Sequence, residues 1–539
     1  MATTEKHDVV ILGGGLAGLT LSLQLKQRFP HLDVLVLERR AHPVPEAAHK
    51  VGESSVEIAA HYFGRVLGLE EYLRKSQLKK FGFRFFFSDG ESDIASVTEL
   101  GASTFLATPS YQLDRGIFEN DLGGFVRNCG VRFLDNAMVR EFTLGKDGAA
   151  HHVGYEHAGA MHQVESRWLI DATGRAGLLK RRLDLSQANE HDANAVWFRI
   201  SERIDVNEWS ADEPWLARCD PPNRWLSTIH LVGEGYWVWL IPLASGSHSV
   251  GIVADAALHP LDSINTFDKA MLWMQRHQPR LFDDLVAKRD KLQDFAFFKH
   301  FSYGCKQVFS GADRWALTGE AGLFLDPFYS PGGDFIAIAN TYITELIGHD
   351  LAGGPLAMVA GMYQRIYFSL YESMLPLYVG QYKLFGDAEV LPIKVLWDYT
   401  FYWGVMCQLF FQDKLTDVIT MGRLHKALAQ SQQINLAMQK FLRAWGEVSK
   451  CRNPAQMLDQ ASLGWFAELN RGLTDKLDKD GFQARMDETL AQLGSLAAAI
   501  VERATGEHPA LDGSEILGLL DADGEAGVGA NSMLFAKAA

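Results

Sequence analysis

The sequence predicts an α/β protein in which a parallel sheet is interrupted by an antiparallel sheet and followed by a helical C-terminal region. Three observations carry this prediction. His7 to Leu12 and Asp33 to Leu37 read as short buried strands, and Gly13 to Leu25 reads as a glycine turn and a helix between them. Such a βαβ unit normally builds a parallel sheet. Aromatic and β-branched runs fill the middle of the chain, and helical patterns dominate after about Thr341.

The inserted sheet and the helices are predicted from the period of the apolar residues. The strand-like runs are Phe81 to Phe87, Ala195 to Ile200, Tyr236 to Pro242 and Ser249 to Val253. The helical patterns are Ile343 to Asp350, Leu356 to Leu375, Leu415 to Trp445 and Pro454 to Ala504. We therefore expect a main body at 1–350 that holds the inserted sheet (about 80–110 and 190–300), a helical region at 351–505 and a loosely ordered tail at 506–539.

Composition excludes several classes of protein. The chain has 539 residues and a formal net charge of −15, which argues against nucleic acid or an anionic membrane as the main partner. No stretch of 18 apolar residues is present, so we expect no transmembrane segment; the uncharged run from Tyr399 to Phe411 is too short and predicts a buried helix. The five cysteines have no CxxC spacing, so we expect neither a disulfide framework nor a metal site, and we expect a cytoplasmic location.

The glycine turn carries the first chemical signal, a G-x-G-x-x-G motif. Gly13 makes the tight turn, Gly15 lets the backbone approach a pyrophosphate, and Gly18 lets the helix pack closely on the strand. Glu38 closes the next strand, where a carboxylate accepts hydrogen bonds from ribose hydroxyls. The alternative is a chance glycine turn. We expect a Rossmann-type domain that binds a dinucleotide through Gly13, Gly15, Ala17, Gly18, Glu38 and Arg39.

Two later segments favour FAD over NAD as that dinucleotide. Trp168 to Arg175 (WLIDATGR) and Trp315 to Pro327 (WALTGEAGLFLDP) resemble the flavin-contacting segments of the para-hydroxybenzoate-hydroxylase-like flavoproteins. Tyr111 to Leu122 (YQLDRGIFENDL) matches the helix start that touches the flavin in this family. The resemblance implies flavin contacts by Gln112, Arg115, Asp171 and Gly319, and by Glu320 or Asp326.

Two points stay open in this resemblance. The family usually has Gly-Asp where this chain has Gly319-Glu320, so either Glu320 or Asp326 could hold the ribityl chain. Arg115 could also be a surface residue of its helix. Because the chain carries no second dinucleotide fingerprint, we expect a separate flavin reductase to supply reduced FAD.

A tryptophan strand and a proline loop narrow the resemblance to the flavin-dependent halogenases. Trp237 to Pro242 (WVWLIP) matches their W-x-W-x-I-P pattern, which implies that Trp237, Trp239, Ile241 and Pro242 line a tunnel beside the flavin. The alternative is that the tryptophans are ordinary core. Phe324 to Gly332 (FLDPFYSPG) matches their F-x-x-P-x-x-S-x-G pattern. The halide and flavin would then lie near Pro327, Ser330, Gly332 and Gly333, where free backbone N–H groups suit an anion.

A lysine ahead of the aromatic run completes the resemblance. Halogenases place a lysine at the far end of the tunnel, where it meets hypohalous acid and directs it onto the substrate. The pattern aligns best at Lys80, and strand alternation would place Lys80 on a face with Gly82 and Lys79 among the phenylalanines. The alternatives are a solvated lysine at a strand edge and Lys50, which we expect to lie against the flavin instead.

The resemblance implies halogenation of an electron-rich aromatic by reduced FAD, oxygen and chloride or bromide. Tryptophan halogenases carry a catalytic glutamate before the loop serine, where this chain has Tyr329, so we expect a phenol- or pyrrole-like substrate, free or tethered to a carrier. Two rivals remain: an aromatic hydroxylase on the same fold, and a flavoprotein whose helical region handles a lipid or polyene.

Overall fold

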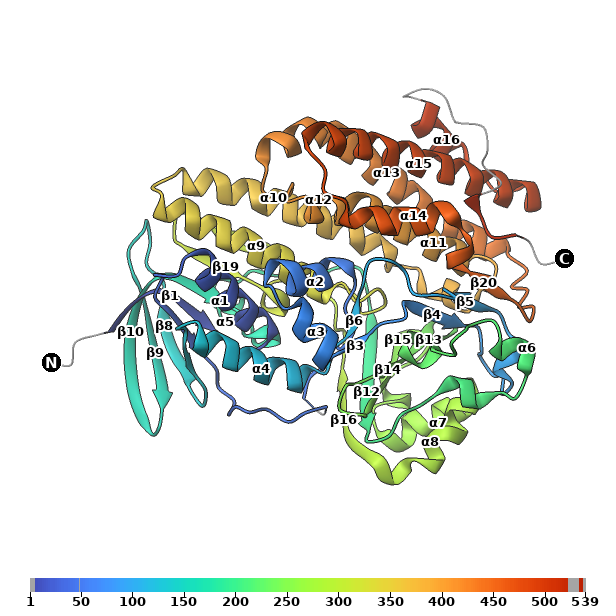
Figure 1. Cartoon of the computed structure of the whole chain (residues 1–539), viewed down its shortest axis with the longest axis horizontal. Coiled ribbons are helices and arrows are strands. Elements are labelled where there is room, and N and C mark those ends of the chain that lie inside the picture. The colour runs from blue at the N-terminus through green and yellow to red at the C-terminus, as the bar shows by residue number, and fades with distance from the viewer. Residues whose placement is uncertain (1–4, 48, 522–532, 537–539) are drawn as a thin grey trace. The chain divides into compact units, whose positions relative to one another are not determined.

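The computed structural model describes the chain except residues 1–4, 48, 522–532 and 537–539. The described chain forms two compact units, each built from three segments. Unit one contains Met1–Gln77, Leu113–Glu190 and Ser302–Tyr371, and unit two contains Leu78–Gln112, His191–Phe301 and Glu372–Ala539. The mixed α/β class expected from the sequence is confirmed (Figure 1). The domain boundaries that the sequence analysis places at residues 350 and 505 stay a prediction.

Unit one is organised around a mainly parallel sheet. Its strand order is β18-β19-β10-β1-β2-β7, and β8 and β9 form an antiparallel extension on β10. The strands are β1 (Glu5–Leu12), β2 (Val34–Leu37), β7 (Arg132–Leu134), β8 (Met138–Thr143), β9 (His151–His157), β10 (Ala160–Asp171), β18 (Phe309–Ser310) and β19 (Trp315–Leu317). Both strands expected at the N-terminus are present and pair in parallel. The carboxyl ends of β1, β2, β10 and β19 therefore meet at one edge, where ligands bind in such sheets.

The helices of unit one follow these strands. They are α1 (Leu16–Arg28), α2 (Glu57–His61), α3 (Glu70–Ser76), α4 (Arg115–Asn128), α5 (Leu178–Arg182), α9 (Gly332–Leu351) and the greater part of α10 (Leu356–Met374). A short pair, β11 (Ser186–Gln187) and β17 (Gly304–Cys305), completes the unit. α1 begins directly after the glycine turn, as expected.

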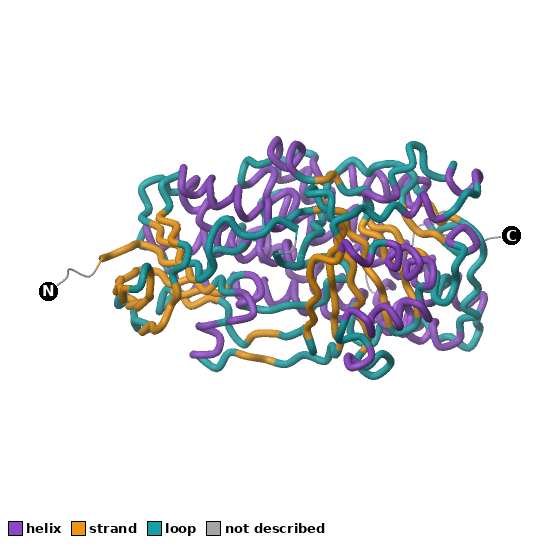
Figure 2. The backbone as a smooth tube through the Cα atoms, turned by 90° about the horizontal axis from the view of Figure 1, so that it is seen from below, coloured by secondary structure: helices purple, strands orange, loops and turns teal. Residues whose placement is uncertain are grey.

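Unit two is built on an eight-stranded sheet, most of whose strand pairs are antiparallel. Its order is β16-β12-β15-β14-β13-β4-β5-β20. Figure 2 draws the strands of both units in orange. The strands are β4 (Phe83–Phe86), β5 (Glu99–Gly101), β12 (Ala193–Ile200), β13 (Thr228–Gly233), β14 (Tyr236–Pro242), β15 (His248–Asp255), β16 (Leu292–Phe298) and β20 (Met457–Asp459). β3 (Leu78–Lys79) and β6 (Tyr111–Gln112) pair separately.

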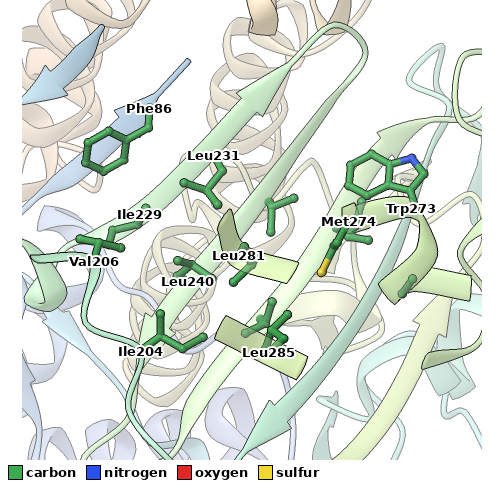
Figure 3. Packing of buried hydrophobic residues seen from close by; sticks show 14 of the residues in the cluster. Phe86, Ile204, Val206, Ile229, Leu231, Leu240, Trp273, Met274, Leu281 and Leu285 are labelled. Atoms are coloured by element: carbon green, nitrogen blue, oxygen red, sulfur yellow. The ribbon is translucent and has the colours of Figure 1, made fainter. Parts of the chain in front are cut away.

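The two faces of this sheet differ in what covers them. Side chains alternate between faces along each strand. One face, including Ile229, Leu231 and Leu240, packs against α7 (Phe267–His277) and α8 (Pro279–Ala287) in a hydrophobic core (Figure 3). The opposite face carries an aromatic set that we call the aromatic face: Phe83, Phe85, His230, Trp237 and Trp239.

The remaining helices of unit two come from the C-terminal part of the chain. They are α11 (Leu391–Phe401), a π-helical turn (Tyr402–Cys407), α12 (Gln408–Phe411), α13 (Val418–Val448), α14 (Gly464–Arg471), α15 (Lys479–Glu507) and α16 (Ser514–Asp521), besides the short α6 (Glu213–Leu216) of the middle segment. The run from Tyr399 to Phe411 is buried and helical, as expected. No helix in the described part of the chain is long and apolar enough to span a bilayer.

Two sequence expectations about elements are wrong. Pro454 to Ala504 is not one helical pattern, because Met457–Asp459 forms β20 and pairs in parallel with β5. Phe81 to Phe87 is not one strand, because Gly82 has a φ of +73° and β4 begins only at Phe83. Of the expected tail, 514–521 are helical, while 522–532 and 537–539 lie outside the described residues.

Candidate active site

The glycine turn between β1 and α1 has the geometry that a pyrophosphate requires. Gly13 has a φ of +104°, and a β-carbon there would overlap the carbonyl oxygen of Ala172. A β-carbon at Gly18 would overlap the carbonyl oxygen of Gly13. Gly15 is the N-cap of α1 and makes no side-chain capping hydrogen bond, so the start of the helix is open to an anion.

A cluster of ionisable side chains lies close to Gly15. A β-carbon on this glycine would lie 2.9 Å from the Nζ atom of Lys50. The Lys50 ammonium bonds the Glu119 carboxylate at 3.0 Å, and Arg115 at the start of α4 also pairs with Glu119. The Nε2 atom of His49 makes a further hydrogen bond with Oε2 of Glu119, at 2.9 Å. Lys50 therefore lies at the glycine turn, where a pyrophosphate would approach. Its expected place against the flavin stays a prediction.

The protonation states of this cluster follow from burial and neighbours. Burial acts to raise the pKa of the Glu119 carboxyl, but the Arg115 guanidinium and the Lys50 ammonium outweigh it and hold this pKa well below its usual range. Burial lowers the pKa of His49 and outweighs the hydrogen bond to the Glu119 carboxylate, which acts to raise it. At neutral pH the imidazole is thus neutral, and the cluster carries two cations against one carboxylate. The surplus positive charge suits a pyrophosphate.

Replacing Glu119 by glutamine should make the chain less stable at neutral pH. The folded pKa is lowered below the value of about 4.3 in an unfolded chain, so the carboxylate stabilises the fold above that pH, and this stabilisation is lost as pH falls through the folded pKa. Glu119→Gln leaves two cations unpaired, so we expect about 3–5 kcal/mol less free energy of unfolding at neutral pH. Urea unfolding at neutral and acid pH measures this. A gap between wild type and variant that stays as wide in acid would contradict the assignment.

Glu38 lies at the end of β2, buried beside the turn. Its Oε2 accepts a hydrogen bond from the backbone N–H of Gly14 at 2.7 Å, and its Oε1 accepts one from that of Arg40 at 2.8 Å. These bonds fix the carboxylate at the carboxyl end of the strand, where it can accept further bonds from ribose hydroxyls. Arg39 beside it is exposed.

The later flavin segments meet the turn at the same sheet edge. β10 ends at Asp171, whose buried carboxylate accepts hydrogen bonds from the backbone of Thr173 (2.9 Å) and Leu179 (2.7 Å) and so shapes the loop itself. Gly319 follows β19 with a φ of +61°, and a β-carbon there would lie 3.2 Å from that of Ala17.

The two candidate carboxylates after β19 differ in their surroundings. Glu320 forms a 2.8 Å ion pair with Arg175. Asp326 is fully buried, and its Oδ1 accepts a hydrogen bond from the backbone N–H of Phe328 at 2.8 Å. That one of these two carboxylates holds the ribityl chain stays a prediction.

The proline loop ends in the N-terminus of a long helix. Ser330 has a φ of +53°, and its N–H donates to the carbonyl oxygen of Pro327 at 2.9 Å. The helix α9 then begins at Gly332, with Pro331 as an N-cap that makes no side-chain capping bond. Ser330, Gly332 and Gly333 thus lie at a helix start whose dipole favours an anion, the arrangement expected for a halide site.

The tryptophan strand is β14, in unit two. The ring centroids of Trp237 and Trp239 are 5.8 Å apart on the aromatic face. The Trp237 Nε1–H donates to the hydroxyl of Tyr382 at 3.2 Å, and the Trp239 ring lies over Gly251, where a β-carbon would overlap it. Ile241 and Pro242 end the same strand and are buried. These contacts fix the positions of both rings. That they line a tunnel stays a prediction.

Gln112 and Lys80 also belong to unit two. The Gln112 amide is fully buried and bonds the Thr228 hydroxyl of β13 at 2.9 Å. Lys80 is 4% exposed, and its Nζ lies 3.4 Å from the ring centroid of Phe83. Lys79 is exposed, with its Nζ 4.7 Å from the ring centroid of Phe105.

The alternation argument for Lys80 is wrong, although Lys80 is the buried lysine of the pair. Alternation assumed one continuous strand, but Gly82 breaks the pleat with its left-handed backbone. The chain turns there, and the Lys80 ammonium lies over the ring of Phe83 rather than on a face away from the phenylalanines. A cation held against an aromatic ring is stabilised by the ring's quadrupole.

Sequence reasoning missed His230, at the centre of the aromatic face. It is fully buried, and its ring centroid lies 4.6 Å from that of Phe85, 5.0 Å from that of Trp237 and 5.2 Å from that of Phe83. The sequence could have indicated it by one feature: a histidine in the apolar strand that precedes the W-x-W-x-I-P strand.

The residues of unit one fit FAD. The open start of α1, the Lys50 ammonium over Gly15 and the carboxylate of Glu38 at the end of β2 provide the contacts that its pyrophosphate and ribose need. When bound, reduced FAD supplies the reaction with dioxygen that oxidises a halide.

Comparison with known proteins agrees with this geometry. An "FAD binding domain" family matches residues 6–248. "Flavin-dependent halogenase chlA" of Dictyostelium discoideum is 26% identical over 446 residues, which is 70% of this chain and 72% of that protein. "1H-pyrrole-2-carbonyl-[peptidyl-carrier protein] brominase" of Pseudoalteromonas luteoviolacea is 26% identical over 335 residues, 62% of this chain and 75% of that protein. The crystal structure of halogenase PltM in complex with phloroglucinol and FAD shares the fold, with a TM-score of 0.64 and 18% identity over 96% of this chain and 99% of that one.

The fold and the nucleotide cradle define an FAD-dependent enzyme. Within that class, the curated halogenase relatives indicate a flavin-dependent halogenase. Its cofactor is FAD, its co-substrate is a halide, and the reaction is a halogenation that consumes reduced FAD and oxygen.

Proposed function

We propose that the chain halogenates an electron-rich aromatic ring, phenol- or pyrrole-like, by way of hypohalous acid held at Lys80. The observation that carries the proposal is the buried Lys80 ammonium, 3.4 Å from the Phe83 ring centroid in unit two. An ammonium there donates a hydrogen bond to the oxygen of hypohalous acid. That bond draws electrons from the halogen and makes it a better electrophile, most strongly where water is excluded.

The substrate class is supported by the relatives and by one departure in this chain. Two relatives are named for a pyrrole carried on a peptidyl-carrier protein, and the PltM structure contains phloroglucinol, a phenol. Tyr329 stands before the loop serine, where tryptophan halogenases have a glutamate. An electron-rich ring needs less help to lose its proton, so a free or carrier-tethered phenol or pyrrole suits this chain.

The proposal includes a halide site in unit one and a separate source of reduced FAD. Gly332 and Gly333, at the start of α9, provide N–H donors of the kind that hold chloride or bromide, and Ser330 lies just before them. A separate flavin reductase supplies reduced FAD, since the sequence carries a single dinucleotide fingerprint. We assign the enzyme to the reducing cytoplasm, a location supported by the free thiols of all five cysteines.

The proposal predicts a halogenated product that depends on both halide and reductase. Purified enzyme with FAD, NADH, oxygen and a set of phenols and pyrroles should add one halogen in the presence of bromide or chloride, as followed by product mass. Product should accumulate rapidly only when a flavin reductase is added, because the enzyme by itself oxidises NADH slowly.

Two results would favour the rivals. Rapid, saturable NADH oxidation by the enzyme alone, with a hydroxylated product that forms equally well without halide, would make the chain an aromatic hydroxylase. Absence of substrate-dependent oxygen consumption with reduced flavin would favour a flavoprotein that handles a lipid or polyene.

A further inference from the structure

The carboxylate of Glu119 lies unusually close to the place of a pyrophosphate. Its side chain is 1% exposed, and its Oε2 is 3.8 Å from the position that a β-carbon on Gly15 would take. A carboxylate at this distance from the glycine turn repels the negative charges of a pyrophosphate, and most strongly where water is excluded. Buried charges are tolerated when charges of the opposite sign pair with them. Binding of FAD therefore requires enough positive charge around Glu119.

The neighbours of Glu119 form one polar cluster within unit one. Its Oε2 bonds the Lys50 ammonium at 3.0 Å and the Nε2 of His49 at 2.9 Å. Its Oε1 accepts a hydrogen bond from the Nε of Arg115 at 3.1 Å. The Arg115 guanidinium also donates to the carbonyl oxygen of Val51 at 2.8 Å, which ties the segment of His49 and Lys50 to α4.

The charges of this cluster do not balance when a pyrophosphate is added. Without FAD, the cations of Lys50 and Arg115 exceed the carboxylate of Glu119 by one charge. A pyrophosphate diester carries a negative charge on each of its phosphates, so its arrival turns that surplus into a deficit of one positive charge. A proton on the ring of His49 would restore the balance.

The hydrogen bond to Glu119 assigns the proton of the neutral His49 ring. The Arg115 guanidinium and the Lys50 ammonium hold the pKa of the Glu119 carboxyl well below its usual range, so Oε2 only accepts. Nε2 therefore donates, and Nδ1 carries the lone pair. Burial lowers the pKa of His49, and the cations of Lys50 and Arg115 lower it further. A pyrophosphate would offset these two cations and so raise the pKa of the ring.

The segments around His49 carry other ionisable groups. Glu38 at the end of β2 and Asp114 at the start of α4 are buried and accept backbone hydrogen bonds. His42 is the other histidine of this part of unit one; its ring lies 4.9 Å from that of Phe133, and its buried Nδ1 has no hydrogen-bond partner in the described chain. The first turn of α1 has no acidic residue. Further along the segment of His49 are the exposed Arg39, Arg40 and Glu46 and the buried Glu53.

We infer that binding of FAD is coupled to the uptake of one proton by His49, an inference that concerns the cofactor and does not depend on the substrate. The proton comes from solvent, an N–H bond forms at the lone pair of Nδ1, and the bond from Nε2 to Glu119 remains. The holoenzyme then contains an imidazolium that balances the charge of the pyrophosphate. The gain in FAD affinity is complete below the pKa of the FAD-free ring and is lost as pH rises through the pKa of the ring in the holoenzyme.

Calorimetric titration of the FAD-free chain with oxidised FAD counts the protons. In buffers of different ionisation enthalpy, we expect an uptake that approaches one proton per FAD at pH values between the two pKa values of the ring. Over that interval the Kd for FAD should rise by up to about tenfold per pH unit. His49→Gln places an amide N–H where Nε2 can be replaced as the donor to Glu119, but it cannot take up a proton. The variant should bind FAD with an uptake near zero and a Kd that stays flat with pH.

His42→Gln is the matched control, because it removes the neighbouring histidine whose ring packs on Phe133 instead of bonding Glu119. It should keep the proton uptake of the wild type. Uptake that persists in His49→Gln would place the proton on another group, such as Glu119, and would overturn the inference. Loss of uptake in His42→Gln, or no uptake by the wild type at any pH, would overturn it as well. The wild-type proton count needs no variant, so this test holds even if His49→Gln fails to fold.

Discussion

Replacing Lys80 by methionine should reduce halogenated product at least about a hundredfold without slowing oxygen consumption. The reason is the proposed separation of tasks: dioxygen and halide would react at the flavin and the α9 helix start of unit one, whereas the Lys80 ammonium, which lies over the Phe83 ring in unit two, would polarise hypohalous acid. Methionine keeps the length and apolar character of a side chain that is 4% exposed, so the fold should persist. The assay follows product mass and oxygen uptake together, with peroxide or free hypohalous acid as the expected by-product.

Lys79→Met is the matched control. It removes the same charge from the adjacent position, but the Lys79 side chain is exposed and its ammonium lies near Phe105 rather than Phe83. We expect near-normal product yield. If Lys80→Met keeps the wild-type yield, or if Lys79→Met loses as much, the lysine assignment is wrong.

Gly15→Val should give a folded protein without FAD. Gly15 has an ordinary φ of −87°, and a β-carbon there meets only the flexible end of Lys50 at 2.9 Å and Glu119 at 3.8 Å, so the apoprotein tolerates a side chain. The added methyl groups would occupy the space of the pyrophosphate, and the loss of that contact should weaken FAD binding by at least about a hundredfold, or about 3 kcal/mol. Flavin absorbance of the purified protein and titration with FAD measure it.

Substitutions at two further glycines serve as controls for this result. Gly124→Ala, in α4 of the same unit, adds a β-carbon with no neighbour within 4 Å and should leave FAD content unchanged. Gly18→Ala would overlap the carbonyl oxygen of Gly13 and should disturb the turn and the fold together. Full FAD occupancy in folded Gly15→Val would show that the cofactor binds elsewhere.

The nucleotide cradle was predictable from sequence because its determinants are local. The turn Gly13 to Gly18 and the carboxylate of Glu38 act through backbone conformation and strand ends that a βαβ pattern already specifies. That Lys50 lies against the flavin stays a prediction; its bond to Glu119 links residues from different parts of unit one, which no local pattern specifies.

The aromatic face was only partly predictable because it is assembled from distant segments. β20 joins the sheet by pairing with β5, far away in sequence, so Met457–Asp459 looked like part of a helical region. The single left-handed residue Gly82 changes which way Lys80 points, and alternation cannot anticipate it. His230 lies among rings from β4 and β14, and the sequence of its own strand does not predict these neighbours.

Product mass under heavy-isotope dioxygen, in the presence of bromide, distinguishes halogen transfer from oxygen transfer. With reductase, FAD and an electron-rich phenol, we expect a product that carries the paired isotope pattern of one bromine and no heavy oxygen, since the labelled oxygen leaves in water. A product that carries heavy oxygen and no bromine would contradict this expectation.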